Sequence, residues 1–111
     1  MKNLNLILDQ FRHIDDGLRI VTVQCFMTIA FNEKTGAYPL TISDLVDKLH
    51  ITMASASRHV MLLSDTRRQG DNGLSLITIT RNPEEGKGNQ KLLRLTTRGK
   101  KLYDNIQQLL E

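Results

Sequence analysis

The chain of 111 residues has little of what stabilises small secreted domains or binds unpaired bases. Its single cysteine, Cys25, excludes an internal disulfide, as is typical of a reducing compartment such as the cytoplasm. Tryptophan is absent and aromatic residues make up 5%, which argues against binding of single strands by base stacking. No apolar run approaches the roughly 20 residues that span a bilayer. The N-terminus also lacks the apolar block and cleavage site of a signal peptide.

The patterns of catalytic and metal-binding sites are missing as well. His13, His50 and His59 fall in three different expected elements without metal-ligand spacing. The sequence shows no Ser/His/Asp set, no carboxylate pair in a plausible cleft and no glycine-rich loop that would cradle phosphate. Cys25 lies in an apolar segment, which favours a small core residue over the alternative of a redox sensor. We therefore expect a protein that is not an enzyme and that has no cofactor and no metal.

Positive charge is concentrated in the second half of the chain. The net charge is +3, with five Lys/Arg and six Asp/Glu in residues 1–50 and ten and six in residues 51–111. The two halves therefore carry −1 and +4. Clustered positive charge is typical of a nucleic-acid-binding surface. A basic face that only contacts solvent explains the charge about equally well.

Length and a hydrophobic content of 40% predict one domain, residues 1–111. Apolar residues at helical spacing predict an N-terminal helix within residues 1–17, which is a candidate dimerisation element. Residues 18–32 are apolar on nearly all sides, and their length favours a helix over a strand. Such a helix must be buried by several neighbours, one of which could be a second subunit.

Residues 41–65 predict two short helices joined by a tight turn, a helix-turn-helix. Thr41 can cap the first helix, and Asp44 stands at the capping-box position. His50 and Ile51 form the expected turn. Thr52 can cap the second helix, expected over residues 53–65.

Residues 74–95 predict a β-hairpin. Residues 74–81 and 91–95 have strand composition, and the polar, glycine-containing residues between them are typical of a turn. Thr96 or Thr97 can cap a final helix within residues 96–111, with an apolar face formed by Leu102, Ile106, Leu109 and Leu110. The order of elements predicts a mainly α fold with a small β-hairpin wing. This is a winged helix-turn-helix with a three-helix core and a C-terminal helix.

Ordered motifs in this arrangement resemble the MarR (multiple antibiotic resistance) regulators. They are Thr41-x-x-Asp44-Leu45-x-x-x-Leu49, Ser55-x-Ser57-Arg58-x-Val60-x-x-Leu63 and Leu95-Thr96-Thr97-Arg98-Gly99-x-x-Leu102. Residues 18–30 also resemble the helix that precedes the family's helix-turn-helix. The resemblance covers residues 18–103 and implies a dimeric transcription factor on a palindromic operator. The chain is short at its C-terminal end relative to the family, whose further helix builds the dimer. A dimer would therefore use the N-terminal helix and the short last helix; otherwise the protein is a monomer.

The resemblance implies that residues 52–60 enter the major groove and that the wing contacts phosphates. The candidate DNA-contacting residues are Thr52, Ala54, Ser55, Ser57, Arg58, Arg81, Lys87 and Lys91. For Thr52, a capping role competes with a DNA contact. For Arg58, the alternative is an ion pair with Asp65 or Asp44.

The predicted function is sequence-specific binding of double-stranded DNA by a homodimeric transcriptional regulator, with repression favoured. A small-molecule effector is compatible with the sequence but not indicated by it. The alternative is a winged-helix module that binds proteins, as an inhibitor or adaptor of polymerase or replication proteins. A third possibility is a replication-origin binder.

Overall fold

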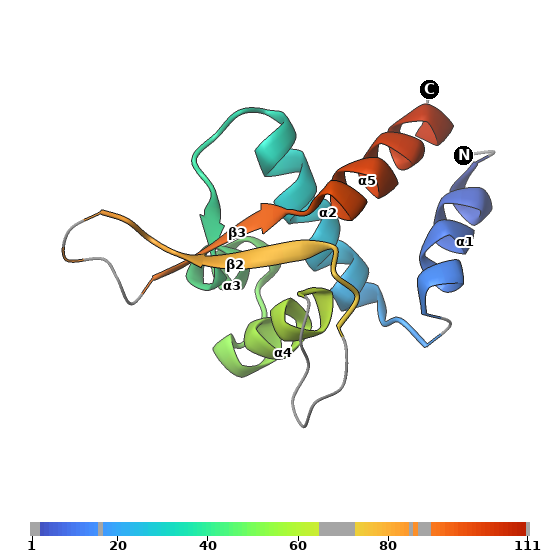
Figure 1. The fold of residues 1–111 in the computed structure, drawn as a ribbon. Helices are drawn as coiled ribbons and strands as arrows, with labels where there is room; N and C mark the ends of the chain where they lie inside the picture. Colours follow the sequence, from blue (N-terminus) through green and yellow to red (C-terminus); the bar gives the residue numbers. More distant parts are fainter. Residues whose placement is uncertain (1–2, 16, 65–72, 85, 87–89, 111) are drawn as a thin grey trace.

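The structure is a computed structural model that describes residues 3–15, 17–64, 73–84, 86 and 90–110. Five helices and three strands follow one another along these residues (Figure 1). In chain order they are α1 (Leu4–Ile14), α2 (Ile20–Lys34), β1 (Leu40–Thr41), α3 (Ile42–Leu49), α4 (Met53–Leu63), β2 (Ile77–Arg81), β3 (Lys91–Leu95) and α5 (Thr97–Leu110). The predicted mainly α fold with a β-hairpin wing is confirmed.

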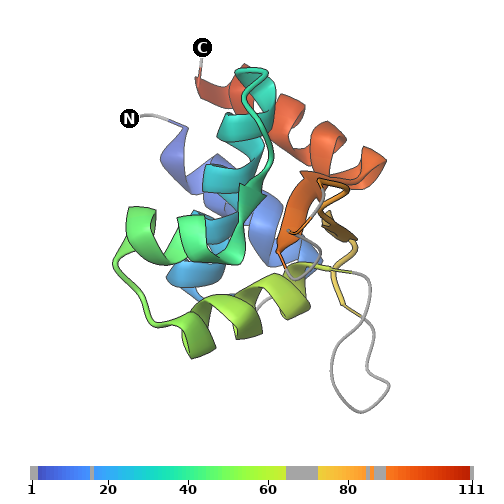
Figure 2. The same ribbon diagram turned by 90° about the vertical axis from the view of Figure 1, so that its left-hand side faces the viewer.

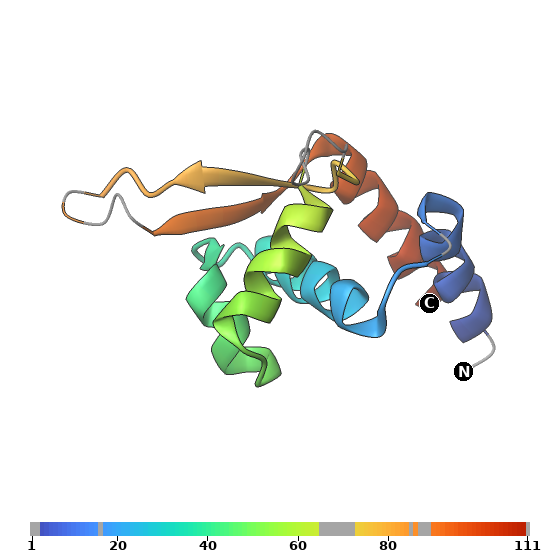
Figure 3. The same ribbon diagram turned by 90° about the horizontal axis from the view of Figure 1, so that it is seen from below.

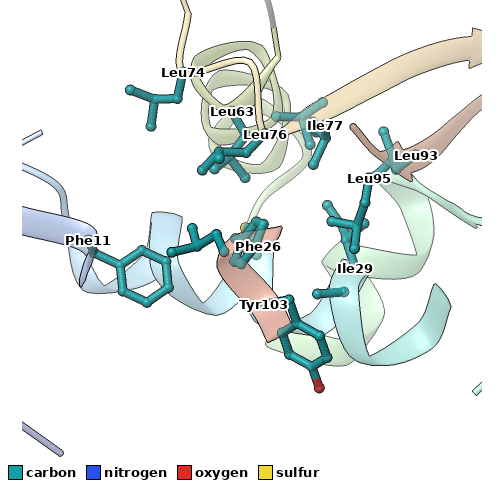
Figure 4. Packing of buried hydrophobic residues seen from close by; sticks show 14 of the residues in the cluster. Phe11, Phe26, Ile29, Leu63, Leu74, Leu76, Ile77, Leu93, Leu95 and Tyr103 are labelled. Carbon is teal, nitrogen blue, oxygen red and sulfur yellow. The ribbon is translucent and has the colours of Figure 1, made fainter. Parts of the chain in front are cut away.

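Helix α2 forms the centre of the core and packs against α3, α4, α5 and β3. Cys25 and Phe26 are fully buried on it, and the ring of Phe26 meets that of Phe11 from α1 edge to face (Figure 4). Within one chain the helix is not covered at its ends, where the sequence left room for a second subunit as a neighbour. Ile20 is 77% exposed and Phe31 is 64% exposed. The helix also lies two residues later than the predicted residues 18–32.

The helix-turn-helix forms from local signals that the sequence contains. The Thr41 amide donates to Asp44 Oδ2 at 2.9 Å, and the Asp44 amide donates to Thr41 Oγ1 at 3.2 Å. This reciprocal box satisfies two backbone groups at the start of α3. His50 ends α3 in the left-handed conformation, with φ 55°. Thr52 Oγ1 then accepts from the Ser55 amide at 3.0 Å and so caps the start of α4. Helix α4 crosses below α2 in Figure 2.

The sheet has three antiparallel strands in the order β1-β3-β2. Ile77 pairs with Leu95 and Arg81 with Lys91, so the predicted hairpin is present and projects beyond the helices (Figure 3). Strand β1 adds an edge in which Leu40 pairs with Leu93. The sequence did not reveal β1, because two residues are too few to show an alternating pattern.

The first strand of the hairpin begins three residues later than predicted. Residues 74–76 are not in the sheet; instead their amides donate to the carbonyl oxygens of residues 62–64 at 2.9 to 3.0 Å. These bonds satisfy carbonyls that the end of α4 leaves without helical partners. Ser75 has a left-handed backbone, with φ 58°, which interrupts the extended conformation. Residues 74–76 are therefore hydrogen-bonded to the end of α4 immediately before β2 begins.

The junction between β3 and α5 explains the motif at residues 95–99. The Thr96 amide donates to Leu76 O at 3.1 Å, and Thr96 Oγ1 donates to Ser75 O at 2.6 Å. Thr96 Oγ1 also accepts from the Gly99 amide at 3.0 Å, so Thr96 caps α5. A Cβ on Gly99 would lie 2.0 Å from Leu76 O. Only glycine lets α5 approach the backbone this closely.

Candidate nucleic-acid interface

Helix α4 has one face in the core and the opposite face in solvent. Ala56, Val60 and Leu63 are buried, at 0%, 0% and 1% exposure. Ala54 and Arg58 are exposed on the other side. Because the buried residues recur at three- and four-residue spacing, the core fixes which side of the helix faces outward. The outward side is free to lie in a groove of DNA.

The structure places the five candidates on α4 at or beside this outward face. Thr52, Ala54 and Arg58 are exposed, and Ser55 and Ser57 are half-buried. The Thr52 hydroxyl caps the helix, as the competing interpretation predicted. Its role in DNA contact stays a prediction, as do those of the other four.

Arg58 has no ion-pair partner in the described part of the chain. One of its alternative partners, Asp44, instead bonds to the Thr41 amide in the capping box. The other, Asp65, lies outside the described residues. An exposed guanidinium without a carboxylate partner can make bidentate bonds to phosphate or to a guanine edge.

On the wing, Arg81 and Lys91 are exposed cross-strand partners at the outer end of the paired strands. Alternation along β2 puts Arg81 on the same face as Ile77, which is buried in the core. The two cations thus lie on the face of the sheet that packs against the helices at its Ile77 end. Lys87, the remaining candidate, lies outside the described residues, whereas Glu84 is exposed near the tip.

Asn82 holds the base of the wing tip. Its side chain is 4% exposed, and its Oδ1 accepts from Tyr38 Oη at 3.3 Å and from the Glu84 amide at 2.9 Å. Its Nδ2 donates to Gln90 Oε1 at 3.1 Å. Asn32 Nδ2 on α2 donates to Tyr38 O at 3.0 Å, so polar bonds connect α2 to the wing. None of these bonds was predicted, because their partners lie up to 44 residues apart.

Sequence reasoning also missed the surroundings of His59. His59 Nδ1 lies 2.8 Å from Thr22 Oγ1, within hydrogen-bonding distance across α2 and α4. The pKa of His59 is lowered from its usual value by partial burial, then by the positive charges of Arg58 and Arg19. Arg19 immediately precedes α2 and is 40 residues from His59, so no local pattern could have joined them.

Other site types find little support among the described residues. No group of three or more His, Cys, Asp and Glu side chains there could hold a metal ion. Cys25 is 0% exposed, and burial raises the pKa of its thiol to about 11. A thiol in this setting is poorly reactive, as expected for a core residue. Within the same residues, no helix has the length and apolar character needed to cross a membrane.

No protein-family model and no curated protein sequence matches the chain. Among solved structures, the chain is similar to the crystal structure of MarR, with a TM-score of 0.62 and 18% identity over 96% of this chain and 72% of that one. The chain has a MarR-like winged-helix fold. A disulfide-formed structure of AbfR is also similar, with a TM-score of 0.63 and 11% identity over 96% of this chain and 64% of that one. The chain thus spans about two thirds of the length of AbfR. Because the sequence identities are only 18% and 11%, the similarity to these two structures shows the fold alone.

Proposed function

We propose that the protein is a sequence-specific regulator of transcription that binds double-stranded DNA and is not an enzyme. Residues 52–60 at the start of α4 enter the major groove, and Arg81, Lys87 and Lys91 on the wing contact phosphates. The bound protein acts as a repressor by covering a promoter in the cytoplasm. The observation that carries the proposal is the exposed Arg58, which has no ion-pair partner among the described residues, on a helix whose opposite face is fixed in the core.

We further propose that two copies bind together through α1 and α5. These helices pack side by side, and Asn3 Nδ2 donates to Leu109 O between them. Leu4, Leu8 and Leu110 are 46%, 42% and 49% exposed on this pair of helices. Leu110 was expected on the buried face of α5 but is half exposed. Burial of exposed leucines against a second copy is favourable, at about 25 cal/mol per Å² of apolar surface.

Selection of binding sites from random duplex DNA, followed by a mobility-shift assay, tests the DNA-binding function. The wild-type protein should enrich one palindromic sequence and bind it more weakly as salt rises. Arg58→Ala should lower the affinity by roughly tenfold or more, since a charge-assisted hydrogen bond from arginine to DNA contributes about 1.5–3 kcal/mol. Lys34→Ala is the matched control, because Lys34 is an exposed cation on α2 that pairs with Asp104. Full affinity and selectivity in Arg58→Ala would contradict the role of α4.

Light scattering at several protein concentrations tests the dimer. The expected mass is twice 12.6 kDa. Leu8→Lys should reduce it to one chain, while Thr78→Lys on the exposed part of the wing should leave it unchanged. A wild-type monomer that binds no DNA and is retained by a protein partner would instead favour the protein-binding alternative.

A further inference from the structure

His59 on α4 lies within electrostatic range of two arginines. His59 on α4 is influenced by Arg58 on the same helix and by Arg19 from the segment before α2. Neither arginine has an ion-pair partner in the described part of the chain. Bringing like charges together without a carboxylate costs free energy, and a bound anion would remove that cost. The cluster therefore has the chemistry of an anion site, although only Arg58 was expected to contact DNA.

The orientation of the His59 ring is fixed by α2. Its Nδ1 lies 2.8 Å from Thr22 Oγ1, and Thr22 is only 1% exposed. Since the two ring nitrogens lie on opposite edges, Nε2 points away from this buried hydroxyl. The ring is half-buried, and no described residue forms a hydrogen bond with Nε2. Nε2 therefore has no described partner and can donate to a bound ligand when it carries a proton.

Among the described residues, the charges that shift the pKa of His59 are both positive. From the segment before α2 comes Arg19, and from α4 comes Arg58. Helix α3 also packs against α4, but its charged residues, Asp44, Asp47 and Lys48, do not contribute to the shift. Burial and the two arginines keep the pKa of His59 below its usual 6.5, so the ring is neutral at neutral pH in the unbound protein.

We propose that Arg19, Arg58 and His59 bind one backbone phosphate of duplex DNA, and that His59 takes up a proton from solvent as the phosphate binds. The imidazolium then donates its Nε2–H to a phosphate oxygen, while the negative phosphate offsets the repulsion from both arginines. Since binding and protonation favour each other, DNA affinity rises as pH falls. This site adds pH sensitivity to the proposed DNA-binding function and rests on it.

Fluorescence anisotropy with a labelled random-sequence duplex at low salt tests the proton uptake. Wild-type affinity should rise about threefold or more between about pH 7.5 and 5.5, by linkage to one proton. His59→Asn keeps an amide near the position of Nδ1, to bond Thr22, but cannot titrate. It should lose most of this rise. His13→Gln on α1 is the matched control and should keep it. Because His59→Asn could destabilise α4, its thermal unfolding is measured first.

Salt dependence tests the arginine. Arg19→Ala should lower the slope of log affinity against log salt by about one, because it removes one phosphate contact. Lys34→Ala, which removes an exposed cation of α2 that pairs with Asp104, should leave the slope unchanged.

A third measurement does not depend on any variant. The pKa of His59, followed by NMR of the wild-type protein, should be higher with the duplex than without it. A pKa that is equal or lower in the complex would overturn the inference, as would equal pH dependence in wild type and a folded His59→Asn. In either case salt-sensitive DNA binding would still stand. If the wild-type protein binds no duplex at any pH, the proposed function fails together with this inference.

Discussion

Helix α4 and the wing both carry candidate DNA contacts, but different interactions hold them. Helix α4 is fixed by buried apolar side chains, above all Val60 and Leu63, and by the Thr52 cap. Beyond Arg81 and Lys91, the wing depends on hydrogen bonds centred on Asn82. Apolar burial contributes several kcal/mol per side chain, whereas a hydrogen bond contributes about 0.5–1.5 kcal/mol net. We therefore expect helix α4 to be harder to displace than the hydrogen-bonded residues around Asn82.

The most damaging change to the helix should be Leu63→Ala. Leu63 is 1% exposed, and a cavity at such a site costs about 2–5 kcal/mol of unfolding free energy. Met61→Ala on the same helix removes a side chain that is 38% exposed and should cost less than about 1 kcal/mol. Urea unfolding followed by circular dichroism measures both. Equal losses would show that burial does not decide how α4 is held.

Gly99→Ala should cause the next largest loss of unfolding free energy. It disturbs the contact between α5 and Leu76, which links α4 to the first strand of the wing. The new Cβ would lie 2.0 Å from the backbone oxygen of Leu76, so α5 must move away. Overpacking of this kind costs about 1–3 kcal/mol. Gly17→Ala is the control, since its Cβ would meet Asp15 Oδ1 only at 3.6 Å. The same unfolding measurement applies, and an unaltered midpoint for Gly99→Ala would refute the close approach.

Asn82→Ala should weaken the wing and spare the helix. It removes the partners of Tyr38 Oη, the Glu84 amide and Gln90 Oε1, and should cost about 1 kcal/mol overall. Hydrogen exchange should become faster at the Glu84 amide and stay unchanged in α4. Tyr38→Phe removes one of these bonds and should have a smaller effect. Faster exchange throughout α4 would mean that the two regions are not independent.

The contrast between α4, held by local burial and capping, and the wing, held by distant polar contacts, explains which parts of the structure the sequence predicts. The spacing of Leu45, Val60 and Leu63 and the Thr41–Asp44 pair predict the helix-turn-helix, because burial and capping act over a few residues. The strand composition of residues 74–76 predicted a strand there. This was wrong, because their backbone groups form hydrogen bonds with the end of α4 and with Thr96 and not with a neighbouring strand.

The polar contacts at Asn82 and His59 could not be predicted from the sequence. They join residues that only the fold brings together, as with Thr22 and His59, which are 37 positions apart. The candidate residues on α4 lie on the predicted helix, and their contact with DNA stays a prediction; the polar side chains around them and at the wing were not foreseen.

The smallest expected effect concerns α2, which supports both regions. Burial raises the pKa of Cys25 from 9.0 to about 11, so the folded protein keeps the thiol proton that the unfolded chain loses. This contribution to stability is complete below pH 9 and falls as pH rises toward 11. The stability difference between wild type and Cys25→Ala should therefore shrink in that range. A constant difference between about pH 8 and 10 would contradict a buried, protonated thiol.

Residues 74–76 connect the end of α4 to the start of α5 through hydrogen bonds. Their amides bond to the last carbonyls of α4, and the carbonyls of Ser75 and Leu76 bond to Thr96 at the start of α5. A shift of α4 relative to α5 would break these hydrogen bonds, so we expect the two helices to move together rather than independently. Slow exchange of the amides of residues 74–76 would be the sign of such a connection.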